Sequence, residues 1–356
     1  MSDAVWMSRA LELAARGRGR TAPNPMVGAV IVRDGAVVGE GWHRAPGRAH
    51  AEVDAIGNSG GATVGATLYV NLEPCCHWGR TPPCTDAVLS AGFSRVVVGQ
   101  VDPDPRVSGR GITQLRAAGL TVDVGVLEGQ ARALNAGYLC ATELRRPRVL
   151  LKAAVSLDGK ISDGFGASQW ITGAEARAAG HRLRDQADAV LVGSGTLLAD
   201  NPSLNTRFEG GRDALPVLLD SDLRCPADAR VLSAGRRPLI FAATDAPDRA
   251  LDADIERVAR GPGGLDLAEV MRHLLARGLH TVLVEGGARV FRSLLDAGLA
   301  DAIHLFVAPI LLPGGVPWVG GAPLALVDAR RFSLVSTERV GDDLALVLEG
   351  PCSAGS

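Results

Sequence analysis

Apolar residues recur along this chain with two different periods. Near the start they recur every three or four residues, which predicts a helix with one buried face. That face consists of Met7, Ala10, Leu11 and Ala14. Two apolar runs then flank Asp34-Gly35, a dipeptide that predicts a β-hairpin between strands 27–32 and 36–39.

Short helices and strands follow the hairpin in alternation. The predicted elements are a helix beginning at 51, a strand at 68–72, a helix beginning at 84, a strand at 95–98, a helix at 112–118 and a strand at 121–126. This order is typical of a layered α/β domain. The segment 142–148 is charged, contains Pro147 and has no periodic face, which is typical of a linker. We therefore expect two domains, 1–145 and 146–352.

The second half begins a new α/β unit. Its predicted strands are 149–155, 189–192, 216–219, 239–242, 281–284, 302–307 and 344–348, and its predicted helices are 174–187, 267–277 and 289–297. Alternating strands and helices indicate a largely parallel sheet that binds ligands at the carboxyl ends of its strands. Glu285-Gly286-Gly287 joins a predicted strand to a predicted helix. Such a segment is either a phosphate-binding turn or an ordinary tight turn. Gly193-Ser194-Gly195 lacks the third glycine of a Rossmann fingerprint.

Composition narrows the classes of function. The 356 residues are 47% hydrophobic, which is enough for two cores. A net charge of −2 gives no basic footprint and disfavours a nucleic-acid partner. The amino terminus has no signal-peptide core, and no apolar run is long enough to span a membrane. Six cysteines in a chain of this length fit a reducing cytoplasm.

The most informative residues for chemistry are His50-Ala51-Glu52, Cys75 and Cys84. One imidazole and two thiolates are the protein ligands of an open zinc site, which keeps its fourth position for water. Glu52 lies too close in sequence to His50 to chelate easily and is placed to move protons. His-x-Glu with a later Pro-Cys pair is the signature of zinc deaminases.

Other interpretations of these residues stay open. A structural zinc site would need a fourth ligand, which Cys76 or His77 could supply. Eight residues separate Cys75 from Cys84, whereas the signature usually has two. The longer loop is expected to belong to the substrate pocket or its rim.

Further motifs extend the pattern to nearly the whole chain. The first half resembles the riboflavin-biosynthesis deaminase of the cytidine-deaminase superfamily, through Pro23-Asn24-Pro25-x-Val27-Gly28, His50-Ala51-Glu52 and the segment from Glu73 to Cys84. The second half resembles the reductase of the same family, a relative of dihydrofolate reductase. Its matching stretches are 152–159, 168–172, 196–207 and 285–287. The long cysteine spacing is normal in that family.

The resemblance implies two consecutive reactions in riboflavin synthesis. The first domain would use one Zn²⁺ to deaminate 2,5-diamino-6-(5-phosphoribosylamino)pyrimidin-4(3H)-one by hydrolysis. The second would use NADPH to reduce the ribosyl group, giving 5-amino-6-(5-phosphoribitylamino)uracil. It also implies a small-molecule substrate and a homo-oligomer. A nucleic-acid-editing deaminase and a non-catalytic pair of domains are the rival functions.

The resemblance also assigns roles to residues. Glu52 would be catalytic and His50, Cys75 and Cys84 would bind the metal. Cofactor contacts would come from Ala154, Trp170, Thr196, Asp200, Ser221, Gly287, Ala288, Arg289, Val290, Phe291, Arg292 and Ser293. Substrate contacts would come from Asn24, Ser168, Arg184, Leu204, Arg207 and Glu285.

Several of these residues have a second interpretation. Asn24 can present a donor and an acceptor to a pyrimidine, or simply form a turn before Pro25. Arg184 and Arg207 suit a phosphate, although Arg184 also fits a solvated helix face. His77 and Arg80 could contact the substrate, and Cys76 is expected to be a bystander. Lys152 could lie near the sugar or form a structural ion pair.

Overall fold

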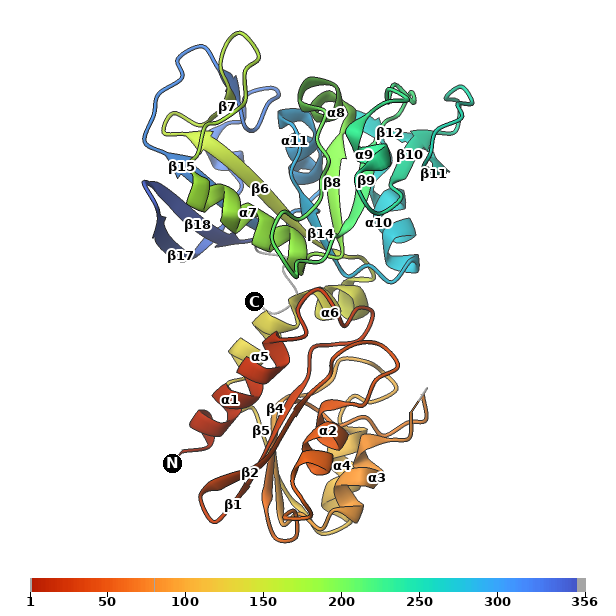
Figure 1. The fold of residues 1–356 in the computed structure, drawn as a ribbon, viewed down its shortest axis with the longest axis vertical. Helices are drawn as coiled ribbons and strands as arrows, with labels where there is room; N and C mark the ends of the chain where they lie inside the picture. The colour runs from red at the N-terminus through yellow and green to blue at the C-terminus, as the bar shows by residue number, and fades with distance from the viewer. Residues whose placement is uncertain (1, 80, 351–356) are drawn as a thin grey trace. The chain divides into compact units, whose positions relative to one another are not determined.

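The computed structural model describes residues 2–79 and 81–350. In these residues the backbone divides into two compact units, one up to Arg145 and one from Arg146 onward. Each unit has its own sheet and its own buried apolar core. Figure 1 labels their helices and strands.

The first unit is built around a mixed sheet. Its elements are α1 (Asp3–Ala15), β1 (Gly28–Arg33), β2 (Ala36–Trp42), α2 (Ala51–Asn58), β3 (Thr67–Leu72), α3 (Cys84–Ser90), β4 (Arg95–Gln100), α4 (Arg110–Ala117), β5 (Thr121–Val124), α5 (Glu128–Leu134) and α6 (Ala136–Leu139). The strand order is β2-β1-β3-β4-β5. β1 runs antiparallel to β2 and β3, and β3, β4 and β5 are parallel. The predicted helices and strands are confirmed, with small shifts at their ends.

Alternation along the strands of this sheet sends side chains to two cores. Ala29 and Ile31 pack with residues of α2, α3 and α4 on one face. Val30 and Val32 pack with residues of α1 and α5 on the other. This period of two is what a strand buried on both faces requires. The unit is therefore a three-layer α/β/α sandwich, with helices on either side of the sheet (Figure 1).

The expected linker is partly helical. α5 and α6, which were not predicted, lead into a π-helical turn at Cys140–Leu144. Arg145 then adopts a left-handed conformation, with φ of 56°, and β6 (Arg148–Ser156) begins three residues later. The expected linker 142–148 thus holds the end of this π-helical turn and the start of β6, and the two units divide within it, between residues 145 and 146. The helices α5 and α6 were not predicted because they are too short to show a periodic face.

The second unit contains a larger sheet. After β6 its elements are β7 (Lys160–Ser162), α7 (Ala174–Gln186), β8 (Ala189–Gly193), α8 (Ser194–Asp200), β9 (Leu215–Leu219), α9 (Arg230–Ser233), β10 (Leu239–Ala243), β11 (Asp254–Val258), β12 (Arg260–Gly261), β13 (Gly264–Leu265), α10 (Leu267–Ala276), β14 (Thr281–Val284), α11 (Ala288–Asp296), β15 (Ala302–Ala308), β16 (Val316–Pro317), a 3-10 turn at Leu326–Asp328, β17 (Ser333–Val340) and β18 (Asp343–Glu349). The predicted elements are all present. The short strands and helices β7, α8, α9, β11, β12, β13, β16 and β17 were not predicted.

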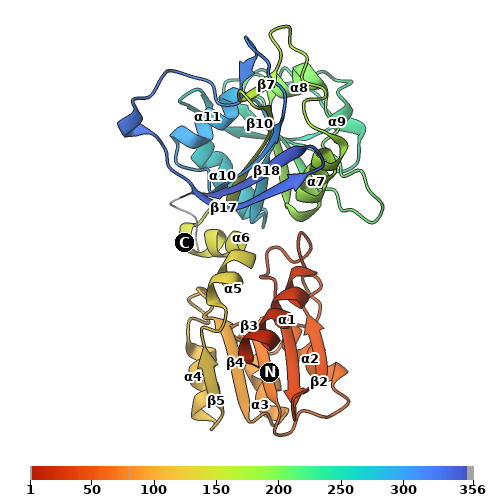
Figure 2. The ribbon, with the colours of Figure 1, turned by 90° about the vertical axis from the view of Figure 1, so that its left-hand side faces the viewer.

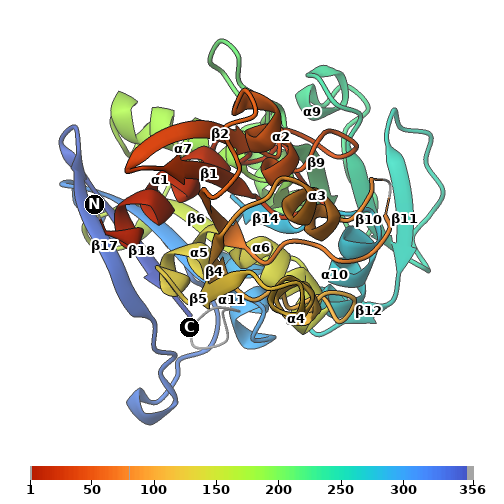
Figure 3. The ribbon, with the colours of Figure 1, turned by 90° about the horizontal axis from the view of Figure 1, so that it is seen from below.

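The strand order of this sheet is β11-β10-β9-β8-β14-β6-β15-β18-β17. Figure 3 labels β17 and β18 at one end of the sheet and β10 and β11 at the other. The strands from β11 to β15 are parallel, and β18 and β17 pair antiparallel at one end. α7 covers one face, and α10 and α11 cover the other (Figure 2). β8 and β10 are buried along their whole length, as expected for parallel strands covered on both faces. The prediction of a largely parallel sheet is confirmed.

Buried carboxylates accept backbone N–H groups where strands of this sheet begin. Asp301 is fully buried, and its Oδ2 accepts from the backbone of Val149 at 2.8 Å. The same carboxylate binds both terminal nitrogens of Arg146, at 2.6 and 2.8 Å. Asp188 accepts from two successive backbone N–H groups, those of residues 280 and 281, each at 2.9 Å. These bonds fix the starts of β6 and β14.

Candidate functional site

The three expected zinc ligands come from different elements of the first unit. His50 precedes α2 as its N-cap residue, and Cys84 is the first residue of α3. Cys75 follows β3, at the edge where the parallel strands end. Residues at helix starts and strand ends are held by regular structure, so the three side chains have fixed positions.

Their ligand atoms converge. Nδ1 of His50 lies 3.1 Å from Sγ of Cys84 and 3.6 Å from Sγ of Cys75. The backbone N–H of Cys84 donates to Sγ of Cys75 at 3.4 Å. All three atoms lie within 4.8 Å of one another, and neither cysteine forms a disulfide. Two sulfurs and one imidazole nitrogen at this spacing fit Zn²⁺.

The other nitrogen of His50 has its own partner. Nε2 lies 3.3 Å from the hydroxyl oxygen of Thr81. A hydrogen bond from Nε2 fixes the ring and leaves Nδ1 to face the sulfurs, as is usual for histidines that bind metals. Thr81 lies on the long loop between the two cysteines, so this loop supports the site.

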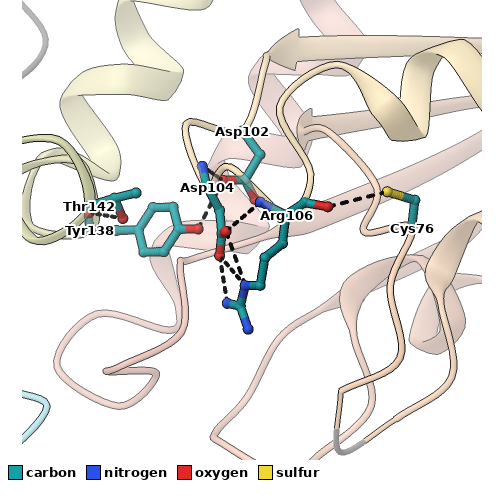
Figure 4. A network of polar contacts seen from close by, with 6 residues as sticks. All are labelled: Cys76, Asp102, Asp104, Arg106, Tyr138 and Thr142. Carbon is teal, nitrogen blue, oxygen red and sulfur yellow. Dashed lines mark hydrogen bonds and ion pairs between the residues drawn. The ribbon is translucent and has the colours of Figure 1, made fainter.

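The closed, structural form of a zinc site is not supported. Cys76 turns away and donates to the carbonyl of Arg106 at 3.7 Å (Figure 4). Among the described residues, the cluster that could hold an ion contains His50, Cys75 and Cys84, without Cys76 or His77. A zinc ion held by these three residues would keep its fourth position for a ligand from solution.

Glu52 lies in the first turn of α2 and is almost completely buried. Burial raises the pKa of Glu52 to about 7. A carboxyl group with such a pKa can hold or release a proton near neutral pH, which general acid–base catalysis requires. Glu52 is not part of the ligand cluster, in agreement with a role in moving protons.

Asn24 is connected to this cluster through His43. The Asn24 side-chain amide donates to Nε2 of His43 at 3.0 Å, while Nδ1 of His43 faces the carbonyl of Ala49 at 3.1 Å. Burial lowers the pKa of His43, which favours the neutral ring that this pattern needs. The ring of His43 packs edge-on against that of His50, with centroids 5.4 Å apart. Asn24 also forms a backbone turn with Thr21, in agreement with its second interpretation as a turn residue before Pro25.

A network of polar contacts that reaches Cys76 was not predicted from the sequence (Figure 4). Asp102 accepts from the hydroxyl of Tyr138 and from the backbone of Asp104, each at 2.9 Å. Burial raises the pKa of Asp102 to about 6. Glu73, two residues before Cys75, accepts from the backbones of residues 102, 109 and 112. Asp102 follows β4 directly, and a carboxylate after a parallel strand was the signal that could have found it.

The loop between the cysteines is only partly described. Arg80 lies outside the described residues. Nδ1 of His77 is buried and has no hydrogen-bond partner among the described residues. A buried polar atom without a partner is costly, so His77 is suited to meet a ligand.

In the second unit, a cavity of about 870 Å³ lies along the carboxyl ends of the parallel strands. It is lined by nearly all residues expected to contact cofactor or substrate there: Ala154, Ser168, Trp170, Arg184, Thr196, Asp200, Leu204, Arg207, Ser221, Glu285, Gly287, Ala288, Arg289, Val290, Phe291 and Ser293. Lys152 lines it as well. These residues come from β6, β8, β9, β14 and the segments that follow them, which is where ligands of such sheets bind.

Arg292 is the exception. Its guanidinium binds Asp296 at 2.6 Å and the carbonyl of Ala322 at 2.9 Å, and it does not line the cavity. Positions 292 and 296 are one helical turn apart and share a face of α11. The seven consecutive residues 287–293, all predicted to contact the cofactor, run into helix α11, so one of them, Arg292, points away from the cavity.

Arg184 is placed differently from both interpretations offered by the sequence. Its guanidinium binds Glu285 with two hydrogen bonds, at 2.6 and 2.8 Å, and donates to the carbonyl of Asn205 at 2.9 Å. Its side chain is 14% exposed, so it is not on a solvated face. Because this fork already grips a carboxylate, Arg184 is not a free phosphate partner. Arg207 is exposed, and its guanidinium donates to the hydroxyl of Ser203 at 3.2 Å.

The Arg184–Glu285 pair sets the charge at this end of the cavity. Burial opposes ionisation of Glu285, but the charge and hydrogen bonds of Arg184 outweigh it and lower the pKa of Glu285 to about 2. Burial also lowers the pKa of Lys152, whose ammonium lies near the same carboxylate. His181 lies within electrostatic reach of Arg184, Glu285, Lys152 and Arg207. The cavity thus has one end where several ionisable groups meet.

Comparison with known proteins identifies the family. The model of the cytidine and deoxycytidylate deaminase zinc-binding region matches residues 1–100, and the model of the RibD C-terminal domain matches residues 147–346. The riboflavin biosynthesis protein RibD of Bacillus amyloliquefaciens is 43% identical, over 97% of this chain and 95% of that protein. The RibD of Escherichia coli (strain K12) is 38% identical, over 98% of this chain and 100% of its own. This chain belongs to the RibD family.

Solved structures agree with the RibD assignment. A Thermotoga maritima diaminohydroxyphosphoribosylaminopyrimidine deaminase/5-amino-6-(5-phosphoribosylamino)uracil reductase superposes with a TM-score of 0.90 at 36% identity, over 98% of both chains. RibD of Acinetobacter baumannii gives 0.89 at 36% identity, also over 98% of both. As a RibD protein, this chain is a bifunctional deaminase and reductase of riboflavin biosynthesis, with a zinc-binding deaminase region and a reductase domain of the NADPH-using type. In the described part of the chain, every helix is too short or too polar to cross a membrane.

The zinc assignment in this RibD protein can be tested by replacing a predicted ligand and, as a control, a neighbouring cysteine outside the cluster. Cys84→Ser should lose most of the bound zinc, because serine is a poor ligand in a site built for thiolate. Cys76→Ser should keep one zinc per chain, since that thiol points toward Arg106. Metal content of the two purified variants, measured by elemental analysis, checks this. Equal zinc content in both would contradict the ligand assignment.

Proposed function

We propose that the first domain, residues 1–145, deaminates 2,5-diamino-6-(5-phosphoribosylamino)pyrimidin-4(3H)-one. We propose that the second, residues 146–352, then reduces the phosphoribosyl group to give 5-amino-6-(5-phosphoribitylamino)uracil. Residues 351 and 352 lie outside the described residues. The observation that carries the proposal is the presence of two separate groups of side chains, each at the carboxyl edge of its own sheet. The Thermotoga maritima relative is described as having both activities.

In the deaminase, His50, Cys75 and Cys84 would hold Zn²⁺. When bound, the ion supplies a Lewis acid that lowers the pKa of water toward neutrality. Glu52 would carry a proton to the ring nitrogen and then to the departing amine, in keeping with its raised pKa. Asn24 would bind the pyrimidine edge through its amide oxygen, since its amide nitrogen already donates to His43. His77 would meet the substrate through its buried Nδ1.

In the reductase, the cofactor contacts would be Ala154, Trp170, Thr196, Asp200, Ser221 and the cavity-lining residues of segment 287–293. NADPH, when bound, supplies the hydride. Substrate contacts would be Ser168, Leu204, Arg207 and Glu285, with Arg184 acting through Glu285. Asp200 already accepts from the hydroxyl of Ser168 at 2.7 Å, so cofactor and substrate residues adjoin each other.

Glu285 and Lys152 would orient the sugar. The carboxylate of Glu285 is kept ionised by Arg184, so it can accept hydrogen bonds from ribosyl hydroxyl groups. The ammonium of Lys152 is a donor on β6, in the same cavity. Together they present an acceptor and a donor to the ring that must open. Arg207 would bind the 5-phosphate with its exposed guanidinium.

We also propose that the protein forms homo-oligomers through its reductase unit. β17 is an end strand of the larger sheet, and most of its residues are exposed. Leu334 and Val335 on this strand are 62% and 60% exposed, and Leu326 and Val327 before it are 86% and 90% exposed. Apolar residues along an unpaired sheet edge favour pairing with a second copy. Sedimentation as a monomer at micromolar concentration would contradict this.

We propose a cytoplasmic location and no nucleic-acid partner. Cys75, Cys76, Cys84 and Cys225 form no disulfide, which suits a reducing compartment. The net charge of −2 does not favour a polyanion. Recovery of the native protein from a fraction other than the cytosol would contradict the location, and tight binding of tRNA in moderate salt would contradict the absence of a nucleic-acid partner.

The first test of the proposed roles is Glu52→Gln. The variant should keep its zinc and bind substrate but lose about two or more decades of deaminase rate, the usual contribution of a placed proton carrier. Asp54→Asn is the matched control on the same helix, because Asp54 pairs with Arg44 and the backbone of Trp42. Single-turnover deamination measures the effect. An unchanged rate in Glu52→Gln would show that another group moves the proton.

A second test separates the domains. A fragment that begins at Arg146 should fold, bind NADPH and reduce the deaminated intermediate, because its core is self-contained. Product mass and NADPH fluorescence measure these properties. A folded fragment without affinity for NADPH would overturn the assignment of the cofactor to this domain.

The substrate phosphate provides the third test. Arg207→Ala should chiefly raise the KM of reduction, since a lost phosphate contact weakens ground and transition states alike. The increase should be on the order of ten- to a hundredfold. Arg182→Ala is the matched control, because Arg182 is exposed on α7 and does not line the cavity. A fall in kcat alone would place Arg207 at the reacting atoms instead.

A further inference from the structure

The reductase cavity has two chemically different ends. Four neighbouring parallel strands, β9, β8, β14 and β6, contribute residues to it in that order. Strands of a sheet are about 4.8 Å apart, so the β9 and β6 ends are about 14 Å apart. Lys152, Ala154 and Glu285 belong to the β14–β6 end. Ser221, Asp222 and Arg224 belong to the β9 end.

The proposed chemistry predicts which end of the cavity would hold which half of the cofactor. The sugar to be reduced would lie among Arg207, Glu285 and Lys152, so the nicotinamide ring must lie near them. A dinucleotide stretched along the strand ends then places its adenosine at the β9 end. NADPH differs from NADH by one phosphate on that adenosine ribose. The residues that distinguish the two cofactors are therefore expected beside β9.

Three arginines line the β9 end and its neighbourhood, and their partners differ. Arg260 is held by two carboxylates, Asp245 at 2.8 Å and Asp222 at 2.7 Å. Arg230 donates to the backbone carbonyl of Asn201 at 2.6 Å, at the end of α8. Arg224 donates to the neutral hydroxyl of Ser194 at 2.6 Å and has a single long contact, 3.9 Å, with Asp220.

Arg224 is also held rigidly. Its neighbours in sequence, Leu223 and Cys225, are buried, so Arg224 must point outward to the rim of the cavity. The turn is closed by the carboxylate of Asp220, which accepts from the backbone of Cys225 at 2.8 Å. Arg249 donates to the carbonyls of residues 223 and 225, at 2.5 and 2.8 Å. A side chain carried on a backbone that is fixed in advance loses less freedom when it binds an anion.

Hydroxyl groups complete the surroundings of Arg224. Ser194 follows β8 and Ser221 follows β9, and both line the cavity. The β12–β13 hairpin lies beside Ser221, because a Cβ on Gly264 would be 3.6 Å from the Ser221 hydroxyl. An exposed, weakly compensated guanidinium that is hydrogen-bonded to the Ser194 hydroxyl, with the Ser221 hydroxyl in the same cavity, is suited to a phosphate dianion.

We propose that Arg224, supported by Ser194 and Ser221, binds the 2′-phosphate of NADPH and sets the preference for NADPH over NADH. This inference rests on the proposed assignment of the cofactor to the second domain. It makes Arg224 a specificity-determining residue that acts on binding and leaves the chemical step alone. Arg260, whose charge is already balanced by two carboxylates, contributes little.

The test is equilibrium binding of NADPH and NADH to the full-length protein, followed by nicotinamide fluorescence without substrate. Arg224→Ala should raise the Kd for NADPH about ten- to a hundredfold, because hydrogen bonds to a charged group are lost. Its Kd for NADH should change less than about twofold, since NADH has no 2′-phosphate to lose. Arg260→Ala removes the same charge from the same cavity and should leave the NADPH/NADH ratio nearly unchanged.

Each other outcome overturns the inference. If Arg224→Ala raised the Kd for NADPH and the Kd for NADH by the same factor, Arg224 would only support the fold. If Arg260→Ala changed the ratio of the two Kd values more than Arg224→Ala does, the 2′-phosphate would be assigned to the β12–β13 hairpin instead. Equal affinities of the unaltered protein for both dinucleotides would remove the preference itself. Failure of the unaltered protein to bind either dinucleotide would overturn the cofactor assignment as well, so the two failures are distinguishable.

Discussion

The need to satisfy backbone N–H groups near the ends of buried strands shapes both units. Such groups have no partner in the sheet, and leaving them unpaired in a core is costly. In this chain, buried carboxylates accept them: Glu73 in the first unit, and Asp188, Asp220 and Asp301 in the second. Glu73, Asp188 and Asp301 each join segments that are far apart in the sequence, and Asp220 closes a tight turn. The functional loops start from positions fixed in this way.

This constraint separates structural acids from chemical ones. Glu73 precedes the zinc ligand Cys75 and holds three backbone donors, so its oxygens are occupied. Glu52 has a raised pKa and is buried near the cluster. Glu285 is a third case, because its charge is maintained by Arg184 while it faces the cavity. Burial alone does not identify a catalytic carboxylate, whereas the partners of its two oxygens do.

The sequence predicted local chemistry better than contacts between distant elements. The zinc cluster was predictable because each ligand type occurs in a recognisable motif, and the long buried strands were predictable from continuous apolar runs. The ion pair of Arg184 depends on how α7 and β14 lie in space, 101 residues apart, and no local pattern reports it. β17 was missed because nearly all of its residues are exposed, so it lacks the alternation that marks a strand. Arg292 lies outside the cavity because consecutive residues of a motif point to different sides once the motif enters a helix.

The eight-residue segment between Cys75 and Cys84 has a consequence for how this enzyme could change. A metal ion bound to both cysteines closes that segment into a ring. The entropy of closing a loop grows only slowly with its length, so inserting or exchanging residues within the ring would cost the metal site little. Thr81 is an exception, because its hydroxyl contacts the zinc-ligand candidate His50 and its replacement would disturb that imidazole ring. The remainder of this segment could therefore vary at little cost to metal binding.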